Sequence, residues 1–331
     1  MRLRKKYLLV CTLSTLSVLQ AQDFHLSMYD AAPLFLNPAM TGLVESKMRA
    51  HAQFRNQWNA LAYKPYTTAL VSFDVPKDKW GFGGQITNMR AGFANYNVLQ
   101  VLGSVAYDLP VDAKRYHNLS LGLQLGFNQK QLENGLITFD SQFTTANGGS
   151  FDKSLPNGEN FKGQAYFQEV VNFGALYYYG KQQTRFNPFV GFSTFNLTKP
   201  KDSFVGGDNR LPRRYYYHAG IRINASEIFY FIPKILIYAQ AHIIQQTYAL
   251  DAGYYFKGEK FYALAGYTFR VNDASIVYMG LKKDNYIFKL AYDFNTSSLR
   301  GVSKTRGAYE ISITWLGKKS KNSEIKNCPR L

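Results

Sequence analysis

The chain has 331 residues, enough for one large domain or two, and 25 Tyr with 25 Phe raise its aromatic share to 16%. Its formal net charge is +17, but the basic residues are spread along the chain without a compact basic-aromatic motif, so we do not expect nucleic-acid binding. After the first 21 residues no stretch reaches about 18 uninterrupted apolar residues, which excludes a bundle of membrane helices.

Residues 1–21 have the pattern of a secretory signal peptide: a basic start, an apolar run over 7–19, and Ala21 as the last residue removed. The basic start consists of Arg2, Arg4, Lys5 and Lys6. Cleavage lowers the net charge by these four, from +17 to +13, and leaves Cys328 as the one remaining cysteine. We therefore expect an exported protein whose mature chain has no internal disulfide.

The next segment, residues 22–46, shows neither strand nor helix periodicity. It contains Asn37-Pro38-Ala39, and Pro38 disfavours the helical conformation for Asn37. The Phe, Leu and Met content of this segment argues against a disordered leader. We expect it to be lumenal or periplasmic, with Asn37, Pro38 and Ala39 as part of a hatch inside a barrel.

Strand periodicity begins near residue 48, and it is clearest over His117–Asn128. There Leu119, Leu121 and Leu123 alternate with polar or small residues, so the leucines share one face. A half-buried strand of a soluble sandwich is the alternative. About ten residues suffice for a tilted strand to cross a bilayer, and the recurrence of such stretches favours a membrane barrel.

The sequence predicts fourteen strands, an even number as in bacterial barrels. They are 48–55, 67–74, 80–89, 95–108, 117–130, 168–179, 186–195, 215–224, 234–245, 247–256, 261–271, 275–283, 285–295 and 307–316. We therefore predict an all-β fold, a transmembrane antiparallel β-barrel over residues 47–316.

The predicted connections alternate in length. Those after even strands are short turns, among them 225–233, whereas those after odd strands include the longest, such as 131–167 and 196–214. Short turns on the periplasmic side and long loops on the extracellular side are typical of outer-membrane barrels. A chain that starts its first strand in the periplasm also ends there, so we expect 317–331 to be a basic periplasmic tail.

Motifs for catalysis are absent from the sequence: there is no Gly-x-Ser-x-Gly elbow, phosphate loop or His-Glu-x-x-His. The five His are scattered and give no metal-ligand spacing. We therefore expect no enzyme and no catalytic, cofactor-binding or metal-binding residues.

A lumenal charged cluster is predicted where the barrel closes. Glu310 begins the last strand at its outer end, Arg55 ends the first strand there, and Asp293 ends the strand before the last. Because the last strand must pair with the first, the three side chains should meet. We favour a structural ion-pair network over a transport role for them.

Short motifs along the whole chain carry a family resemblance. They are Asn37-Pro38-Ala39-x-x-Gly42, Arg55-Asn56-Gln57-Trp58, Pro65-Tyr66-Thr67-Thr68, Asn172-Phe173-Gly174, Gly191-Phe192-Ser193, Tyr292-Asp293, Gly307-x-x-Glu310-Ile311-Ser312 and Cys328-Pro329-Arg330. With them the chain resembles the PorP/SprF outer-membrane proteins of the Bacteroidetes type IX secretion system, which is linked to protein export and gliding motility. Tyr309 and Leu331 depart from the His and Phe that the family tends to have there.

The resemblance implies a non-enzymatic barrel in the outer membrane of a Gram-negative, Bacteroidetes-like bacterium, surrounded by lipid. It implies as partners the periplasmic ring, the peptidoglycan-linked components of the secretion machine and a cognate secreted adhesin or cargo protein. Cys328, Pro329 and Arg330 are candidate docking residues, since Arg offers a planar set of donors to a carboxylate. A solvated tail that aids solubility is the alternative for these residues.

A second function remains open, a FadL-like outer-membrane channel for hydrophobic small molecules. That family also has fourteen strands, an N-terminal hatch and an Asn-Pro-Ala element. The late motifs and the basic extension from Gly317 to Leu331 favour the secretion-system interpretation, because a channel does not need them.

Overall fold

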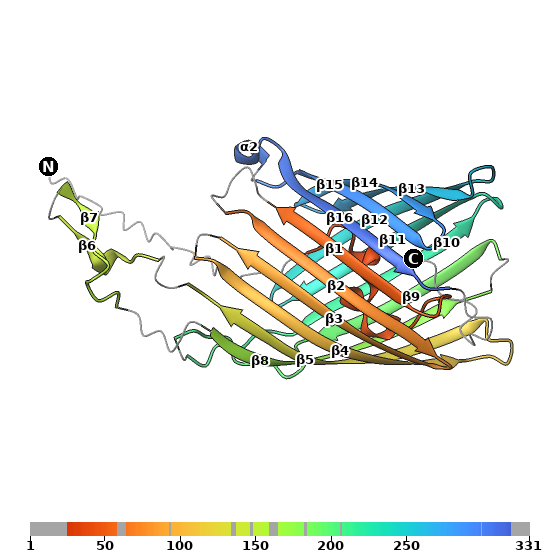
Figure 1. The fold of residues 1–331 in the computed structure, drawn as a ribbon, viewed down its shortest axis with the longest axis horizontal. Helices are drawn as coiled ribbons and strands as arrows, with labels where there is room; N and C mark the ends of the chain where they lie inside the picture. Colours follow the sequence, from red (N-terminus) through yellow and green to blue (C-terminus); the bar gives the residue numbers. More distant parts are fainter. Residues whose placement is uncertain are drawn as a thin grey trace, which may run out of the picture.

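The computed structural model describes residues 25–57, 64–92, 94–133, 137–145, 148–158, 165–181, 184–205, 207–298 and 300–318. The predicted signal peptide, residues 1–21, and the candidate docking residues Cys328, Pro329 and Arg330 lie outside these ranges. In the described part of the chain, fourteen antiparallel strands close into one barrel (Figure 1), which confirms the predicted fold class. None of the helices in that part is long and apolar enough to cross a membrane.

The barrel strands follow chain order around the wall. They are β1 (Arg49–Gln57), β2 (Tyr66–Lys77), β3 (Trp80–Ala91), β4 (Tyr96–Pro110), β5 (His117–Gln131), β8 (Ala165–Tyr179), β9 (Phe186–Phe195), β10 (Arg214–Asn224), β11 (Phe229–Gln240), β12 (Ile243–Phe256), β13 (Phe261–Arg270), β14 (Ala274–Lys283), β15 (Tyr286–Asn295) and β16 (Arg306–Leu316). Each pairs with the next, and β16 pairs with β1 to close the barrel.

The loop between β5 and β8 carries a small hairpin of its own. It is built from η4 (Asp140–Gln142), β6 (Phe143–Thr144) and β7 (Ser150–Phe151), and the rings of Phe143 and Phe151 pack edge to face across it. A short helix, α2 (Arg300–Ser303), precedes β16. The hairpin and α2 both lie at the same end of the barrel (Figure 1).

One predicted strand is misplaced. The predicted strand begins at Lys234 after a predicted turn over 225–233, whereas β11 begins at Phe229. Pro233 lies inside β11 opposite Leu250 of β12. On the other side of β11, the pairing with β10 is interrupted at Ile232 and Pro233. Because proline has no N–H to donate, it sits at this gap in the ladder instead of ending the strand.

The two ends of the barrel differ. At one end β2–β3, β4–β5 and β14–β15 are joined by short turns, and this is called the short-turn end; the opposite end, which bears the β6–β7 hairpin and α2, is called the long-loop end (Figure 1). In bacterial outer-membrane barrels short turns face the periplasm and long loops face outward. Strand β1 begins at the short-turn end, as the sequence analysis predicted.

The two faces of each strand meet different surroundings, and β5 shows this most clearly. Leu121, Leu123 and Leu125 are exposed on the outer surface, while Ser120 and Gln124 are fully buried on the inner surface. Outer leucines suit contact with lipid, and inner polar side chains suit a lumen. The burial of those inner side chains shows that the lumen is filled.

Candidate functional site

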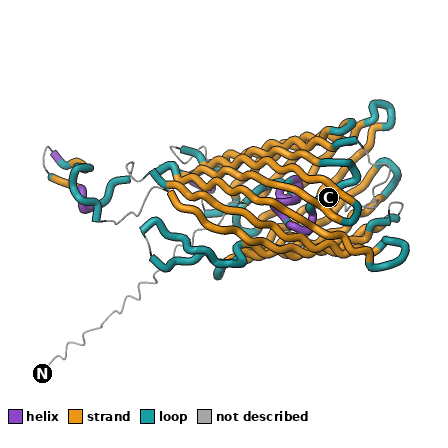
Figure 2. Tube along the Cα trace, turned by 60° about the horizontal axis from the view of Figure 1, so that its bottom comes forward, coloured by secondary structure: helices purple, strands orange, loops and turns teal. Residues whose placement is uncertain are grey.

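A segment of the chain itself fills the lumen. Residues 25–46, called the plug, form three short helical turns: η1 (Tyr29–Ala31), α1 (Pro33–Leu36) and η2 (Pro38–Met40). These turns lie inside the barrel (Figure 2). Leu34, Asn37 and Ala39 are completely buried. The hatch residues Asn37, Pro38 and Ala39 thus lie in the lumen, against the inner wall.

The plug runs along the lumen from one end to the other. Near the long-loop end, the carbonyl oxygen of Leu26 accepts a hydrogen bond from Arg270, the last residue of β13, at 3.4 Å. At the short-turn end, the backbone N–H of Lys47 donates to the carbonyl of Lys318 just after β16, at 3.0 Å. The first described residues of the chain therefore lie toward the long-loop end of the barrel.

The charged cluster predicted from the sequence lies beside the beginning of the plug. Arg55 of β1 and Glu310 of β16 are opposite each other in the strand register. The guanidinium of Arg55 lies 2.9 Å from a carboxylate oxygen of Asp293 and 3.2 Å from one of Glu310. All three side chains are buried, so the lumen brings the three residues together away from solvent.

The plug supplies further partners of this cluster. The backbone N–H groups of Ser27 and Met28 donate to the two carboxylate oxygens of Glu310 at 2.8 and 2.7 Å. The hydroxyl of Ser27 donates to Asp293 at 2.6 Å and accepts from Arg55. A buried carboxylate must be paired and hydrogen-bonded to be tolerated. The cluster therefore fastens the plug to the wall as well as closing the barrel.

A second ionic anchor, which the sequence analysis did not find, holds the plug at Asp30. Its carboxylate lies 2.6 Å from the ammonium of Lys234 on β11 and 3.9 Å from that of Lys289 on β15. Lys234 also pairs with Asp251 of β12. Asp30 lies in an apolar stretch with no regular strand around it, so no periodicity indicated where its side chain would point.

Around Asn37 the contact between plug and wall depends on close fit. The amide of Asn37 donates to the carbonyls of Ala175 and Phe192 at 3.1 and 3.2 Å, and its oxygen accepts from the N–H of Ala39. Gly122 and Gly174 are paired across β5 and β8. A Cβ at Gly122 would lie 2.3 Å from the Pro38 backbone, and one at Gly174 would lie 2.0 Å from Asn37 Oδ1.

Polar side chains of the wall also satisfy the plug backbone. Ser120 donates to the carbonyl of Ala39, Ser193 to that of Leu36 and Gln124 to that of Leu34, at 2.7–2.8 Å. Short helical turns leave carbonyls without partners within the turn, and buried carbonyls need partners. The inner polar face of β5, β8 and β9 therefore fits this particular segment.

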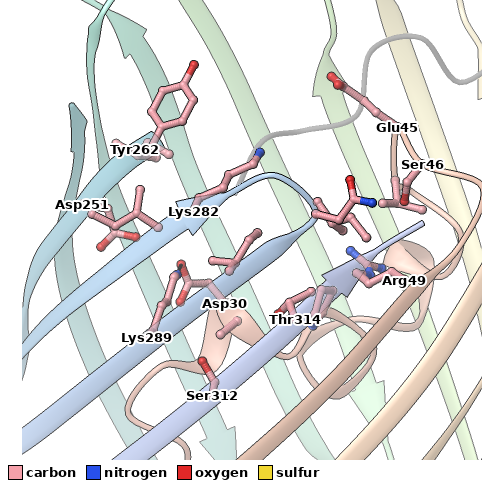
Figure 3. A pocket seen from close by; sticks show the side chains of 18 of the residues that line it. Asp30, Glu45, Ser46, Arg49, Asp251, Tyr262, Lys282, Lys289, Ser312 and Thr314 are labelled. Carbon is pink, nitrogen blue, oxygen red and sulfur yellow. Dashed lines mark ion pairs between the residues drawn. The ribbon is translucent and has the colours of Figure 1, made fainter. Parts of the chain in front are cut away.

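A cavity of about 450 Å³ lies in the lumen at the short-turn end, between the plug and strands β10 to β16 (Figure 3). Its lining includes Asp30, Arg49, Asp251, Lys282 and Lys289. Among the described residues no group of His, Cys, Asp and Glu could hold a metal ion. The lumen thus combines a fixed plug with a charged cavity at one end.

The sequence of this chain matches a known protein family. The family described as type IX secretion system membrane protein PorP/SprF matches residues 18–315. The chain belongs to this family. The match spans the plug and the barrel strands as far as residue 315 in β16. Family membership and the closed barrel support an outer-membrane location and a role in the type IX secretion machinery.

The chain is similar to solved structures at low sequence identity. The toluene transporter TbuX of Ralstonia pickettii is 11% identical, with 88% of this chain and 94% of that chain covered and a TM-score of 0.48. A deletion mutant of the monoaromatic hydrocarbon channel TodX is 11% identical, with 87% and 94% covered and a TM-score of 0.50. At this level of identity, a structural similarity gives information about the fold and not about function. No curated protein sequence matches the chain.

Proposed function

We propose that this protein is a non-enzymatic barrel of the type IX secretion machinery that supports export or surface attachment of a secreted protein, such as an adhesin. Periplasmic ring and peptidoglycan-linked components would be its partners on the short-turn side. The barrel would act as a docking body in the outer membrane rather than as a diffusion pore.

The observation that carries this proposal is the plug and its anchors. The plug fills the lumen and is tied to the wall by the buried ion pair of Asp30 with Lys234, by hydrogen bonds from Ser27 and Met28 to Glu310 and by close contacts at Gly122 and Gly174. A pore for free diffusion needs a water-filled lumen, which a fixed plug would obstruct. A rigid, filled barrel suits protein partners that bind its two ends.

A FadL-like channel for hydrophobic small molecules is supported less well. Pockets for such ligands are lined predominantly by apolar and aromatic side chains. The cavity at the short-turn end mixes apolar and aromatic side chains with charged residues from the plug and the wall, including Arg49, Asp251 and Lys282. A hydrophobic ligand placed there would leave these groups without water.

The test is a clean deletion of the gene, complemented with wild type or with a variant whose plug anchor is broken, Asp30→Asn with Lys234→Met. We expect the deletion to abolish surface display of the cognate secreted protein and the wild type to restore it. Co-purification with periplasmic machine components should accompany rescue. Normal display in the deletion strain, or a purified barrel that carries lipid-like ligand without protein partners, would overturn the proposal.

The tail offers a second, finer part of this proposal, a docking role, since its ending Cys328-Pro329-Arg330 resembles the family's own ending. Truncation after Lys319 should leave barrel insertion intact while reducing both partner co-purification and surface display. Loss of insertion would instead mean that the tail is needed for barrel assembly. A truncated protein that is normal in insertion, partner co-purification and surface display would show that the tail has no docking role.

A further inference from the structure

Two neighbouring turns at the short-turn end carry four exposed cations between them, and these four are called the basic patch. The two turns are side by side because β5 pairs with β8 (Figure 1). The backbone N–H of Gly180 in one turn donates to the carbonyl of Tyr116 in the other at 2.8 Å. The members of the patch are Lys114 and Arg115 on the β4–β5 turn, and Lys181 and Arg185 on the β8–β9 turn.

The basic patch is more positive than the rest of this end. With one flanking residue on each side, its two turns contain four basic residues and one acidic residue, Asp112, a net charge of +3. The carboxylate of Asp112 accepts the backbone N–H of His117 at 2.7 Å, so it is engaged within its own turn. The same count over the other four turns that join described strands gives five basic and four acidic residues, a net charge of +1. Those turns with their flanking residues span 77–80, 224–229, 256–261 and 283–286.

Hydrogen bonds hold both turns of the patch in shape. In the β8–β9 turn, the amide of Asn187 donates to the carbonyl of Lys181 at 2.8 Å and to the hydroxyl of Thr184 at 3.0 Å. In the β4–β5 turn, the amide of Asn118 donates to the carbonyl of Arg115 at 3.2 Å. The backbone that carries the cations is therefore fixed before a ligand binds, which lowers the entropic cost of binding.

Aromatic rings at the edge of the lipid-facing surface lie directly beside the patch. The ammonium of Lys181 lies 5.2 Å from the ring centre of Tyr116, and the guanidinium of Arg185 lies 5.5 Å from that of Phe186. The Tyr116 ring also packs edge to face against Tyr179. Membrane barrels place girdles of aromatic residues at the two membrane–water interfaces. The cations of the patch therefore lie at the level of lipid headgroups.

An apolar wall continues from the patch toward the middle of the membrane. On the outer face, Leu121 of β5 and Val190 of β9 are exposed. Ala175 of β8 lies between Leu121 and Phe192 in the strand register. A molecule whose anionic group lies on the patch would thus have an apolar surface beside it. A phospholipid has both an anionic group and apolar chains, whereas a soluble anion or an acidic peptide matches the cations alone.

We propose that the basic patch is a binding site for an anionic phospholipid of the periplasmic leaflet. The guanidinium of Arg185 and the ammonium of Lys181 would bind the phosphate, and the acyl chains would lie along the outer face of β5, β8 and β9. Clusters of Lys and Arg at a membrane surface attract anionic lipids in this way. Short turns face the periplasm in bacterial outer-membrane barrels, which selects the leaflet. The inference depends on the membrane location of the barrel and not on its role in secretion.

Native mass spectrometry of the purified full-length protein in detergent micelles tests this, with dioleoylphosphatidylglycerol as the probe. The probe should bind more tightly than dioleoylphosphatidylcholine, which has the same acyl chains and no net charge. Lys181→Gln combined with Arg185→Gln should weaken binding of the probe about tenfold. The matched control is Lys257→Gln combined with Lys260→Gln, which removes the same charge from exposed positions of the β12–β13 turn. It should leave binding unchanged, and both double variants should remain heat-modifiable.

Three results would overturn the proposal. Equal affinity for the two lipids would show that the charge of the patch does not select the ligand. Equal weakening by the two double variants would show that the probe responds to the net charge of this end and not to the patch. In the third, a soluble anion displaces the probe. Displacement by glycerol 3-phosphate would indicate a site for free phosphate esters, and displacement by tetraglutamate would indicate a site for an acidic protein segment.

Discussion

The outer and inner faces of the barrel wall follow different rules, although they alternate along the same strands. On β5 the outer face presents Leu121 and Leu123, which are exposed side chains with no particular partner. The inner face presents Ser120, Gly122 and Gln124, each of which meets a specific plug atom. The outer face therefore needs only apolar residues of almost any shape. The inner face accepts polar and charged residues, provided that each fits its neighbour.

The largest effect should come from breaking a charge on the inner face. Arg55→Met keeps most of the side-chain volume but leaves the buried carboxylates of Asp293 and Glu310 without their cation. Removing one partner of a buried ion pair costs roughly 3–5 kcal/mol, so urea unfolding in lipid vesicles should show a loss of this size. Arg306→Met, at an exposed position at the start of β16, is the control. Equal losses for the two variants would contradict the distinction between the faces.

On the outer face, replacing an apolar side chain by a charged one should lower the stability of the barrel. Leu123→Arg should cost roughly 2–4 kcal/mol, the range for a cation facing lipid near mid-membrane. Leu123→Phe should stay within about 0.5 kcal/mol, because lipid does not demand a particular shape. Unfolding measurements on both variants check this. If the phenylalanine variant loses as much stability as the arginine variant, Leu123 does not face lipid.

Size should matter only on the inner face. Gly174→Ala places a Cβ about 2.0 Å from Asn37 Oδ1, and such overpacking costs roughly 1–3 kcal/mol. Gly103→Ala on β4 is the control, since its Cβ would meet no atom closer than 3.9 Å. The same unfolding assay should separate the two variants. Similar stability for both would mean that the plug yields easily around Asn37.

Much of the wall was predictable because the outer face imposes a simple period-two pattern. Alternation along β5 and the parity of loop lengths were enough to place nearly every strand, and the meeting of Arg55 with Glu310 followed from the closure of the barrel. Pro233 shows the limit of this approach. The sequence predicts that this proline ends a turn before the strand, whereas its effect depends on which neighbouring strand needs a backbone N–H at that position, and register decides that.

The plug was predictable only as an apolar segment before the barrel. The contacts that its residues Ser27, Asp30 and Asn37 make with the wall depend on tertiary fit. They join residues far apart in sequence, such as Asp30 and Lys234 or Asn37 and Gly174. No local period encodes such pairs. Asn37-Pro38-Ala39 could be singled out as a motif, but the two glycines that make room for it could not be recognised as its partners.

The central claim is that the plug, anchored to the inner face, keeps the lumen closed, and single-channel conductance in planar bilayers tests it most directly. We expect little or no conductance for the wild-type protein and a clear increase on deleting Leu34 to Met40, with heat-modifiable barrels in both cases. Deleting the same number of residues from the β6–β7 hairpin loop, 148–154, should change nothing. A wild-type protein that conducts as an open porin, or a deletion within the plug that leaves conductance unchanged, would contradict the account.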